Sequence, residues 1–207
     1  MAERNAPKLE TFGCRLNIWE SEVMRSQAGD AGLNNVIIFN TCAVTTEAER
    51  QARQAIRRAR RENPDARIVV TGCAAQIAPQ KWSEMPEVDH VLGNYEKLQP
   101  DQWQTLGAGT GAGTGAGDIV VGDVMSLRET ASHMVDSFHG HTRGFLQIQQ
   151  GCDHRCTFCI IPYGRGNNRS VPRDQIIQSA RKLVDEGCAE IVLTGVDITS
   201  WGADMAG

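Results

Sequence analysis

The chain has 207 residues, 41% hydrophobic and 22% charged, with a formal net charge of −4. This composition belongs to a globular protein and excludes a disordered polar chain, and the net charge does not favour nucleic acid as a partner, although an average can hide a local basic patch. The start of the chain has no apolar run of signal-peptide length, and no segment reaches the roughly 18 apolar residues of a membrane span, so we expect a cytoplasmic protein.

The first hundred residues alternate short apolar runs with helical patterns, which is the rhythm of βαβ units. This order predicts a doubly wound, flavodoxin-like α/β domain with a parallel sheet over residues 1–104. The expected strands are 9–12, 36–39, 68–70 and 88–92, and the expected helices are 18–31, 47–61 and a helix near 77–85.

Residues 105–117 read TLGAGTGAGTGAG and offer no side chain large enough to anchor a core. Such low-complexity composition predicts a flexible loop or linker. We expect the linker region to extend over residues 105–142, with one strand candidate at 119–121 and a polar stretch that contains His133, His139 and His141.

A second α/β unit is expected from Arg143 onwards. Its predicted elements are a strand at 145–149, a helix from about 173 to 184 and a strand at 190–194. A complete (β/α) barrel needs on the order of 200 residues, whereas only 143–207 remain here. The sequence therefore predicts the start of a truncated barrel, and we expect the chain by itself to be inactive.

Three cysteines, Cys152, Cys156 and Cys159, form a CxxxCxxC motif directly after a predicted strand. Seven cysteines without an export signal indicate metal binding rather than disulfides. Three thiolates can hold three corners of a [4Fe–4S] cube and leave one iron open to another ligand. The alternative is a zinc knuckle that includes His154, which we disfavour because this spacing is uncommon at zinc sites.

A second set, Cys14, Cys42 and Cys73, follows three different predicted strands. Ligands bind outside the carboxyl ends of parallel strands, and neighbouring strands are about 4.8 Å apart, so these thiols can converge on one cluster. Any one of them alone would be a small buried hydrophobe, but together they favour a cluster. Cys188 has no partner and is interpreted as a structural thiol.

Both sets lie within longer motifs: TFGCRLNIWESE, FNTCAVTTEAERQARQAIR, VVTGCAAQ and QQGCDHRCTFCIIPYGRGNNRS. These motifs resemble the methylthiotransferases of the radical S-adenosylmethionine (SAM) superfamily. The resemblance implies an auxiliary [4Fe–4S] cluster on the set after the predicted strands and a catalytic [4Fe–4S] cluster, which binds SAM, on the CxxxCxxC set.

Within that family, GCRLNIWESE and NTCAVTTEAE look most like the branch that modifies N6-threonylcarbamoyladenosine at position 37 of tRNA (t6A37). The implied reaction puts a methylthio group on C2 of the adenine, whose unactivated C–H has no acidic proton, so a radical is required. The implied partners are a tRNA anticodon loop, SAM and an electron donor such as flavodoxin or ferredoxin. Rival readings are a methylthiotransferase of isopentenyladenosine or of a ribosomal protein, and a non-catalytic iron–sulfur or zinc module.

The resemblance also implies cofactor contacts by four other residues. Phe158 would pack beside the adenine of SAM, with core packing as its alternative. Arg165 and Arg169 would lie near SAM and substrate, and their alternative role is to form a turn. Asp197 would contact the amino group or ribose of SAM, unless it caps the next helix.

Asn17 and Asn40 flank the auxiliary cysteines, where they either hydrogen-bond to cluster sulfurs or shape turns. The second predicted helix and its exit are strongly basic. A solvated helix face is favoured slightly over phosphate contact, because no aromatic residues interleave the arginines. The arginines are Arg50, Arg53, Arg57, Arg58, Arg60, Arg61 and Arg67.

Overall fold

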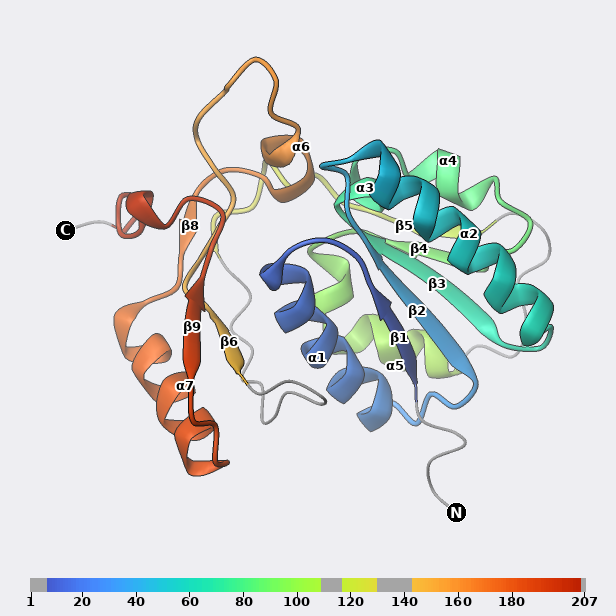
Figure 1. Ribbon diagram of the computed structural model, residues 1–207, viewed down its shortest axis with the longest axis horizontal. Coiled ribbons are helices and arrows are strands. Elements are labelled where there is room, and N and C mark those ends of the chain that lie inside the picture. Colours follow the sequence, from blue (N-terminus) through green and yellow to red (C-terminus); the bar gives the residue numbers. More distant parts are fainter. Residues whose placement is uncertain (1–6, 109–116, 130–142, 206–207) are drawn as a thin grey trace.

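The computed structural model describes residues 7–108, 117–129 and 143–205 (Figure 1). The predicted stretch with His133, His139 and His141 lies outside these residues. Among the described helices, none combines the length and the apolar character needed to cross a membrane.

The first unit contains β1 (Lys8–Thr11), α1 (Arg15–Asp30), β2 (Val36–Thr41), α2 (Thr46–Glu62), β3 (Arg67–Gly72), α3 (Cys73–Ile77), α4 (Pro79–Ser83), β4 (His90–Leu92), η1 (Glu96–Leu98), α5 (Pro100–Ala108) and β5 (Asp118–Val120).

The first unit is built on a five-stranded sheet in which every pairing is parallel, so the predicted α/β class is confirmed. The strand order is β1-β2-β3-β4-β5. The flavodoxin order, 2-1-3-4-5, exchanges the first two strands. The likeness to flavodoxin therefore lies in the parallel sheet with helices on both faces, and not in the order of its first two strands.

Successive side chains of a strand point to opposite faces of the sheet, and both sets are apolar here, which explains why helices cover both faces. On β2, Ile37 and Phe39 pack with α2, α3 and α4, whereas Val36 and Ile38 pack with α1 and α5. Figure 1 shows these helices on opposite sides of the sheet. All residues of β2 are buried, as expected of a central parallel strand.

Two predicted boundaries in this unit change. The single helix expected near 77–85 is instead two short helices, α3 and α4, because the residue before a proline is driven out of the helical conformation and Ala78 precedes Pro79. The predicted linker also starts too early: α5 extends to Ala108, and β5 pairs with β4. The first unit therefore continues beyond the boundary at residue 104.

The second unit contains β6 (Gly144–Gln147), β7 (Gln149–Gln150), α6 (Ile161–Arg165), β8 (Arg169–Ser170), α7 (Arg173–Asp185), β9 (Ile191–Thr194) and η2 (Ile198–Ser200). Strands β6 and β9 are parallel neighbours, and α7 connects them along the chain. Leu146, Ile148 and Leu183 form the core between this pair and α7. This is a βαβ unit of the kind that opens a (β/α) barrel.

Helix α1 is shared by the two units. One side of it packs on the five-stranded sheet through Met24 and Ala28. Its other side packs through Trp19 and Val23 against Phe145 of β6. In Figure 1, α1 accordingly lies between the sheet and the pair β6–β9.

Candidate functional site

The three cysteines that follow β1, β2 and β3 line one cavity of about 520 Å³. The register places Thr11 beside Asn40 and Thr41 beside Gly72, so the three strands end at the same edge. The volume is within the range of about 300–1,000 Å³ typical of ligand sites. Its lining includes Cys14, Cys42 and Cys73 from the first unit, and Arg165, Thr194, Gly195, Val196 and Ile198 from the second.

Close contact between Gly13 and Cys42 helps bring these thiols together. Gly13 has a φ of +97°, and a Cβ at this position would lie 2.7 Å from the Cys42 sulfur. Any side chain here would meet the sulfur, and a left-handed conformation favours glycine in any case. Burial raises the pKa of the Cys42 thiol, and the nearby thiolates of Cys73 and Cys14 raise it further.

Within the described residues, no three His, Cys, Asp or Glu side chains are grouped closely enough to hold a single metal ion. A single zinc ion would need its ligands about 2.0–2.3 Å from one centre. A four-iron cube instead holds its thiolates at separate corners, further apart from one another. Three thiols around one cavity fit such a cluster.

Helix α6, which follows the CxxxCxxC motif, packs directly on α3, which begins at Cys73. The contact is close because Gly164 has no side chain: a Cβ there would lie 3.0 Å from the Cβ and 3.4 Å from the sulfur of Cys73. Asn94 joins the two helices, since its Nδ2 lies 3.6 Å from the Cys73 sulfur and donates to the carbonyl of Gly164. The second unit thus reaches an auxiliary cysteine.

Arg165 lies on this same side of the cavity. Its guanidinium is 2% exposed and binds the carboxylate of Glu20, which is 0% exposed. The other partner of Glu20 is Lys97, at 2.7 Å and also 0% exposed. Arg165 also donates to Asn17, and Lys97 donates to Asn40 at 3.2 Å. A closed network of buried polar groups therefore joins the two units behind the auxiliary cysteines.

The pKa of Glu20 is lowered although burial acts to raise it, because the positive charges of Arg165 and Lys97 outweigh burial. Burial lowers the pKa of Lys97, and Glu20 opposes that effect. Sequence reasoning missed Glu20, Lys97 and Asn94. The available signal for Glu20 was a charged residue at an apolar spacing from Leu16, Val23 and Met24 of α1, whereas Lys97 and Asn94 carry no comparable signal.

Asn17 and Asn40 act mainly on the backbone and on this network. Asn17 donates to the carbonyls of Phe12 and Thr41, at 2.7 and 3.1 Å, and Asn40 donates to the carbonyl of Asn17 at 3.0 Å. The Cys14 sulfur also lies 3.9 Å from the side-chain oxygen of Asn17. Both asparagines therefore shape the loops that present the cysteines.

The CxxxCxxC loop lies outside this cavity, at the end of the pair β6–β9. Cys156 is exposed, and Cys152 and Cys159 are partly exposed. Asp197 approaches the loop: its carboxylate is 4.0 Å from the Cys152 sulfur and 3.3 Å from His154. Hydrogen bonds from Ser200 and Thr199 lower the pKa of Asp197. Asp197 does stand at the start of η2, but its carboxylate accepts from hydroxyl groups rather than from backbone N–H groups.

The other predicted cofactor contacts fall in different surroundings. Phe158 is 91% exposed, so its alternative role in core packing is wrong. Arg169 is buried, donates to the carbonyls of Asn167 and Arg165, and lines a small cavity with Gln150 and Arg165. Cys188 points to the carbonyl of Glu190 at 3.2 Å, away from both cysteine sets.

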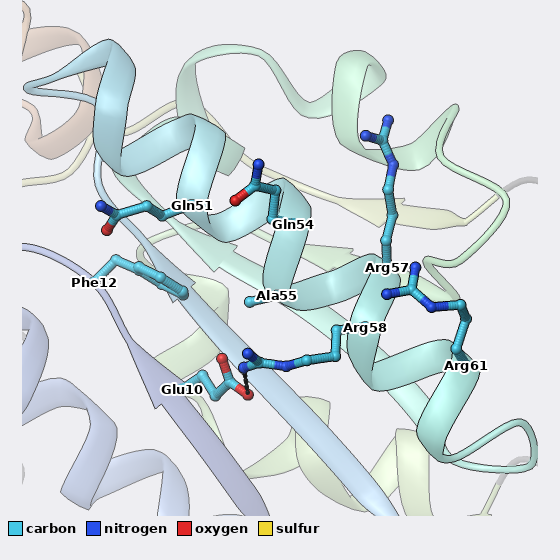
Figure 2. Close-up of a pocket in the computed structure, with 8 residues that line it drawn as sticks. All are labelled: Glu10, Phe12, Gln51, Gln54, Ala55, Arg57, Arg58 and Arg61. Atoms are coloured by element: carbon cyan, nitrogen blue, oxygen red, sulfur yellow. Dashed lines mark ion pairs between the residues drawn. The ribbon is translucent and has the colours of Figure 1, made fainter.

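A separate cavity of about 510 Å³ lies on the basic face of α2 (Figure 2). Figure 2 shows Arg57, Arg58 and Arg61 along its edge, with Glu10 across from Arg58 at 3.8 Å. All three arginines are exposed. Since α2 starts just after Cys42, Arg61 lies about 24 Å along the helix from the auxiliary cysteines. These three arginines are solvated, as the sequence interpretation favoured, whereas Arg60 is partly buried and pairs with Asp89 at 2.6 Å. The cavity on this face shares no lining residue with the cysteine-lined cavity.

Two family models match different parts of the chain. Residues 7–93 match the model of the "Uncharacterized protein family UPF0004", and residues 146–204 match the model of the "Radical SAM superfamily". The first match covers Cys14, Cys42 and Cys73, and the second covers the CxxxCxxC motif and Asp197.

A threonylcarbamoyladenosine tRNA methylthiotransferase (MtaB) of Rickettsia prowazekii is 52% identical over 97% of this chain, which covers 45% of that protein. The same-named protein of Bacillus subtilis is 37% identical over 94% of this chain and is covered to 44%. The ribosomal protein uS12 methylthiotransferase (RimO) of Anaeromyxobacter sp. (strain K) is 34% identical over 96% of this chain and is covered to 43%.

Among solved structures, the radical S-adenosylmethionine methyltransferase TsrM from Kitasatospora setae, with cobalamin and a [4Fe-4S] cluster bound, superposes with a TM-score of 0.56 at 13% identity. The match covers 97% of this chain and 49% of that one, and it supports the fold alone. The chain spans a little less than half the length of the curated relatives it matches. The chain therefore contains one part that matches the UPF0004 model and one that matches the radical SAM model, and over nearly its whole length it is similar to part of these methylthiotransferases.

Proposed function

We propose that this chain is the cluster-binding part of a tRNA methylthiotransferase that acts on C2 of N6-threonylcarbamoyladenosine at position 37. The observation that carries the proposal is the cavity in which Cys14, Cys42 and Cys73 face the end of β9 and the residues after it, Thr194 to Val196. In a (β/α) barrel the chemistry takes place at the carboxyl ends of the strands. A nucleotide that enters there would lie between the two cysteine sets.

In this proposal Cys14, Cys42 and Cys73 hold an auxiliary [4Fe–4S] cluster, and Cys152, Cys156 and Cys159 hold the catalytic cluster that binds SAM. When bound, these groups would supply the electron that cleaves SAM and the sulfur for the product. Residues of the chain itself orient the cofactors and exclude water: Asp197 lies beside Cys152, and the wall formed by α6 closes the auxiliary side.

The proposed substrate implies an anticodon loop as partner and the cytoplasm as location, since unpaired anticodon bases can be splayed into a pocket. Phe158 suits a role beside the adenine of SAM, because its ring is exposed and no core contact occupies it. An electron donor such as flavodoxin or ferredoxin would reduce the catalytic cluster. The proposed division is an auxiliary unit that extends to β5 and a radical SAM unit that begins at β6.

The first test is anaerobic reconstitution of the purified chain. We expect about eight irons per chain, falling to about four when either cysteine set is replaced by alanine. Bound zinc, or iron content that ignores Cys14, Cys42 and Cys73, would refute the proposal and favour a simple metal-binding module.

The substrate is tested in cells that carry or lack the gene that encodes this chain. Mass spectrometry of digested tRNA should find the 2-methylthio form of threonylcarbamoyladenosine only when the gene is present. A methylthio group on isopentenyladenosine, or on a ribosomal protein instead, would assign the chain to another branch of the family.

A further inference from the structure

We propose that Arg165, carried by the second unit, is the counter-ion of the auxiliary thiolates, so that cluster loading in the first unit and docking of the second unit are coupled. The inference rests on the proposed function, because it requires a cluster on Cys14, Cys42 and Cys73. It concerns Arg165, which the sequence analysis expected near SAM, and Glu20 and Lys97, to which the sequence analysis gave no role.

The first step is a charge imbalance inside the protein. Two buried cations, Lys97 and Arg165, share a single buried carboxylate, Glu20. The neutral side chains of Asn17 and Asn40 complete the hydrogen bonding without adding charge. One positive charge is therefore unmatched within the network. Arg169 provides no compensation, because it is itself a buried cation that donates to the carbonyl of Arg165.

A buried positive charge without a partner costs free energy, so a nearby anion should stabilise it. Arg165 lines the same cavity as the auxiliary cysteines. The anions that complement the network are therefore the auxiliary thiolates themselves.

The three cysteines that line the cavity carry negative charge once they hold a cluster, because cysteine ligates a cluster as the thiolate. Cluster binding deprotonates its cysteine ligands. Loading the site thus supplies the negative charge that the network lacks.

The source of Arg165 makes this a coupling between the units. Arg165 ends α6 in the second unit, whereas Glu20, Asn17 and Lys97 belong to the first. Gly164, the preceding residue, lies against Cys73. If α6 moved away, the cluster would lose a positive neighbour and Glu20 would lose a partner. Arg165 is therefore a positioning residue, and its charge should be visible at the cluster.

The test measures the midpoint potential of the auxiliary cluster in a chain whose Cys152, Cys156 and Cys159 are replaced by alanine. Less positive charge nearby makes reduction harder. Arg165→Met and Lys97→Met should each lower the potential, whereas Glu20→Gln should raise it. The double variant Glu20→Gln/Lys97→Met keeps the net charge and should stay near the parent. A purely structural role would shift all of these variants in one direction.

The matched control is Arg143→Met, which removes an arginine from an exposed pair with Glu190 in the second unit. Its potential should equal that of the parent. If Arg165→Met does not fold, the Lys97 and Glu20 variants still give the opposed shifts. Shifts of the same sign, or no difference from Arg143→Met, overturn the inference.

A second readout follows docking directly. Iron loading should slow hydrogen exchange of the α6 amides by at least about tenfold in the parent and not in the Arg165→Met chain. Equal protection in both chains would overturn the coupling. The two proposals fail differently: a chain without the CxxxCxxC cysteines that takes up no iron refutes the proposed function, whereas about four irons with potentials that ignore these charges refutes only this inference.

Discussion

The side-chain nitrogen of Asn94 lies 3.6 Å from the Cys73 sulfur and donates to the backbone carbonyl of Gly164. The side chain of Asn94 therefore contacts both an auxiliary cysteine and the helix that follows the CxxxCxxC motif. The two cysteine sets are widely separated in the sequence, yet the structure links them through a few buried contacts around α3 and α6.

Replacing Asn94 by alanine should weaken the auxiliary cluster. The variant removes a donor beside the Cys73 sulfur, and loss of such outer contacts typically costs 10- to 100-fold in metal affinity. We expect iron to be lost to a chelator about tenfold faster or more, followed by the decay of cluster absorbance. Asn34→Ala, at an exposed position away from both cysteine sets, is the control and should behave as the parent.

Two glycines in helices should respond oppositely to alanine. Gly29 has nothing within 4 Å of a Cβ, so Gly29→Ala in α1 should stabilise the chain by about 0.5–1 kcal/mol. Gly164→Ala would place a Cβ 3.0 Å from the Cβ of Cys73 and should lose that gain or destabilise. Urea unfolding of both variants measures the difference. Equal stabilisation would show that α6 does not pack tightly on Cys73.

The side chain of Gln149 should hold the backbone of the segment after β9 in place. Its side-chain oxygen accepts from the backbone N–H groups of Val196 and Asp197, both at 2.8 Å. Gln149→Leu leaves these donors without their acceptor, and each unsatisfied buried group costs about 1–3 kcal/mol. We expect a loss of at least about 2 kcal/mol in unfolding free energy and weaker SAM binding by calorimetry. Gln104→Leu, on the exposed side of α5, should change neither.

Stability should fall in acid through Glu20. Its folded pKa lies below the ordinary 4.5, because attraction to Arg165 and Lys97 outweighs the opposing effect of burial. Its stabilising contribution is therefore complete above about 4.5 and is lost as pH falls from there through the lowered folded pKa. Denaturant unfolding across this pH range should show that the free energy of unfolding falls less in acid for Glu20→Gln than for the parent.

Salt provides the control for this pH prediction. Glu47 also has a lowered pKa, about 2, caused by hydrogen bonds from Arg50 and Gln51, but it is exposed. Screening should remove the effect of Glu47→Gln at high ionic strength, whereas the effect of Glu20→Gln should persist because that network is buried. If high salt removes the effect of both Glu47→Gln and Glu20→Gln on the free energy of unfolding in acid, the buried network is contradicted.

The sequence by itself determined the fold class and the two cysteine sets. Strand patterns at β1, β2 and β3 placed Cys14, Cys42 and Cys73 at one edge of a sheet, because the ends of parallel strands share that edge. The CxxxCxxC spacing predicted a cluster loop from local chemistry alone. Both inferences depend on short-range periodicity, which a sequence displays directly.

Tertiary packing decided what surrounds those cysteines. Sequence reasoning placed Arg165 near SAM, whereas the structure buries it against Glu20, and 145 positions along the chain separate these partners. It gave Lys97 and Asn94 no role, because charged and amide side chains are normally exposed to solvent. In the folded chain Lys97 is buried against Glu20 of α1, and Asn94 is buried where α6 packs on α3. Burial then makes a few ordinary polar residues the electrostatic environment of the site.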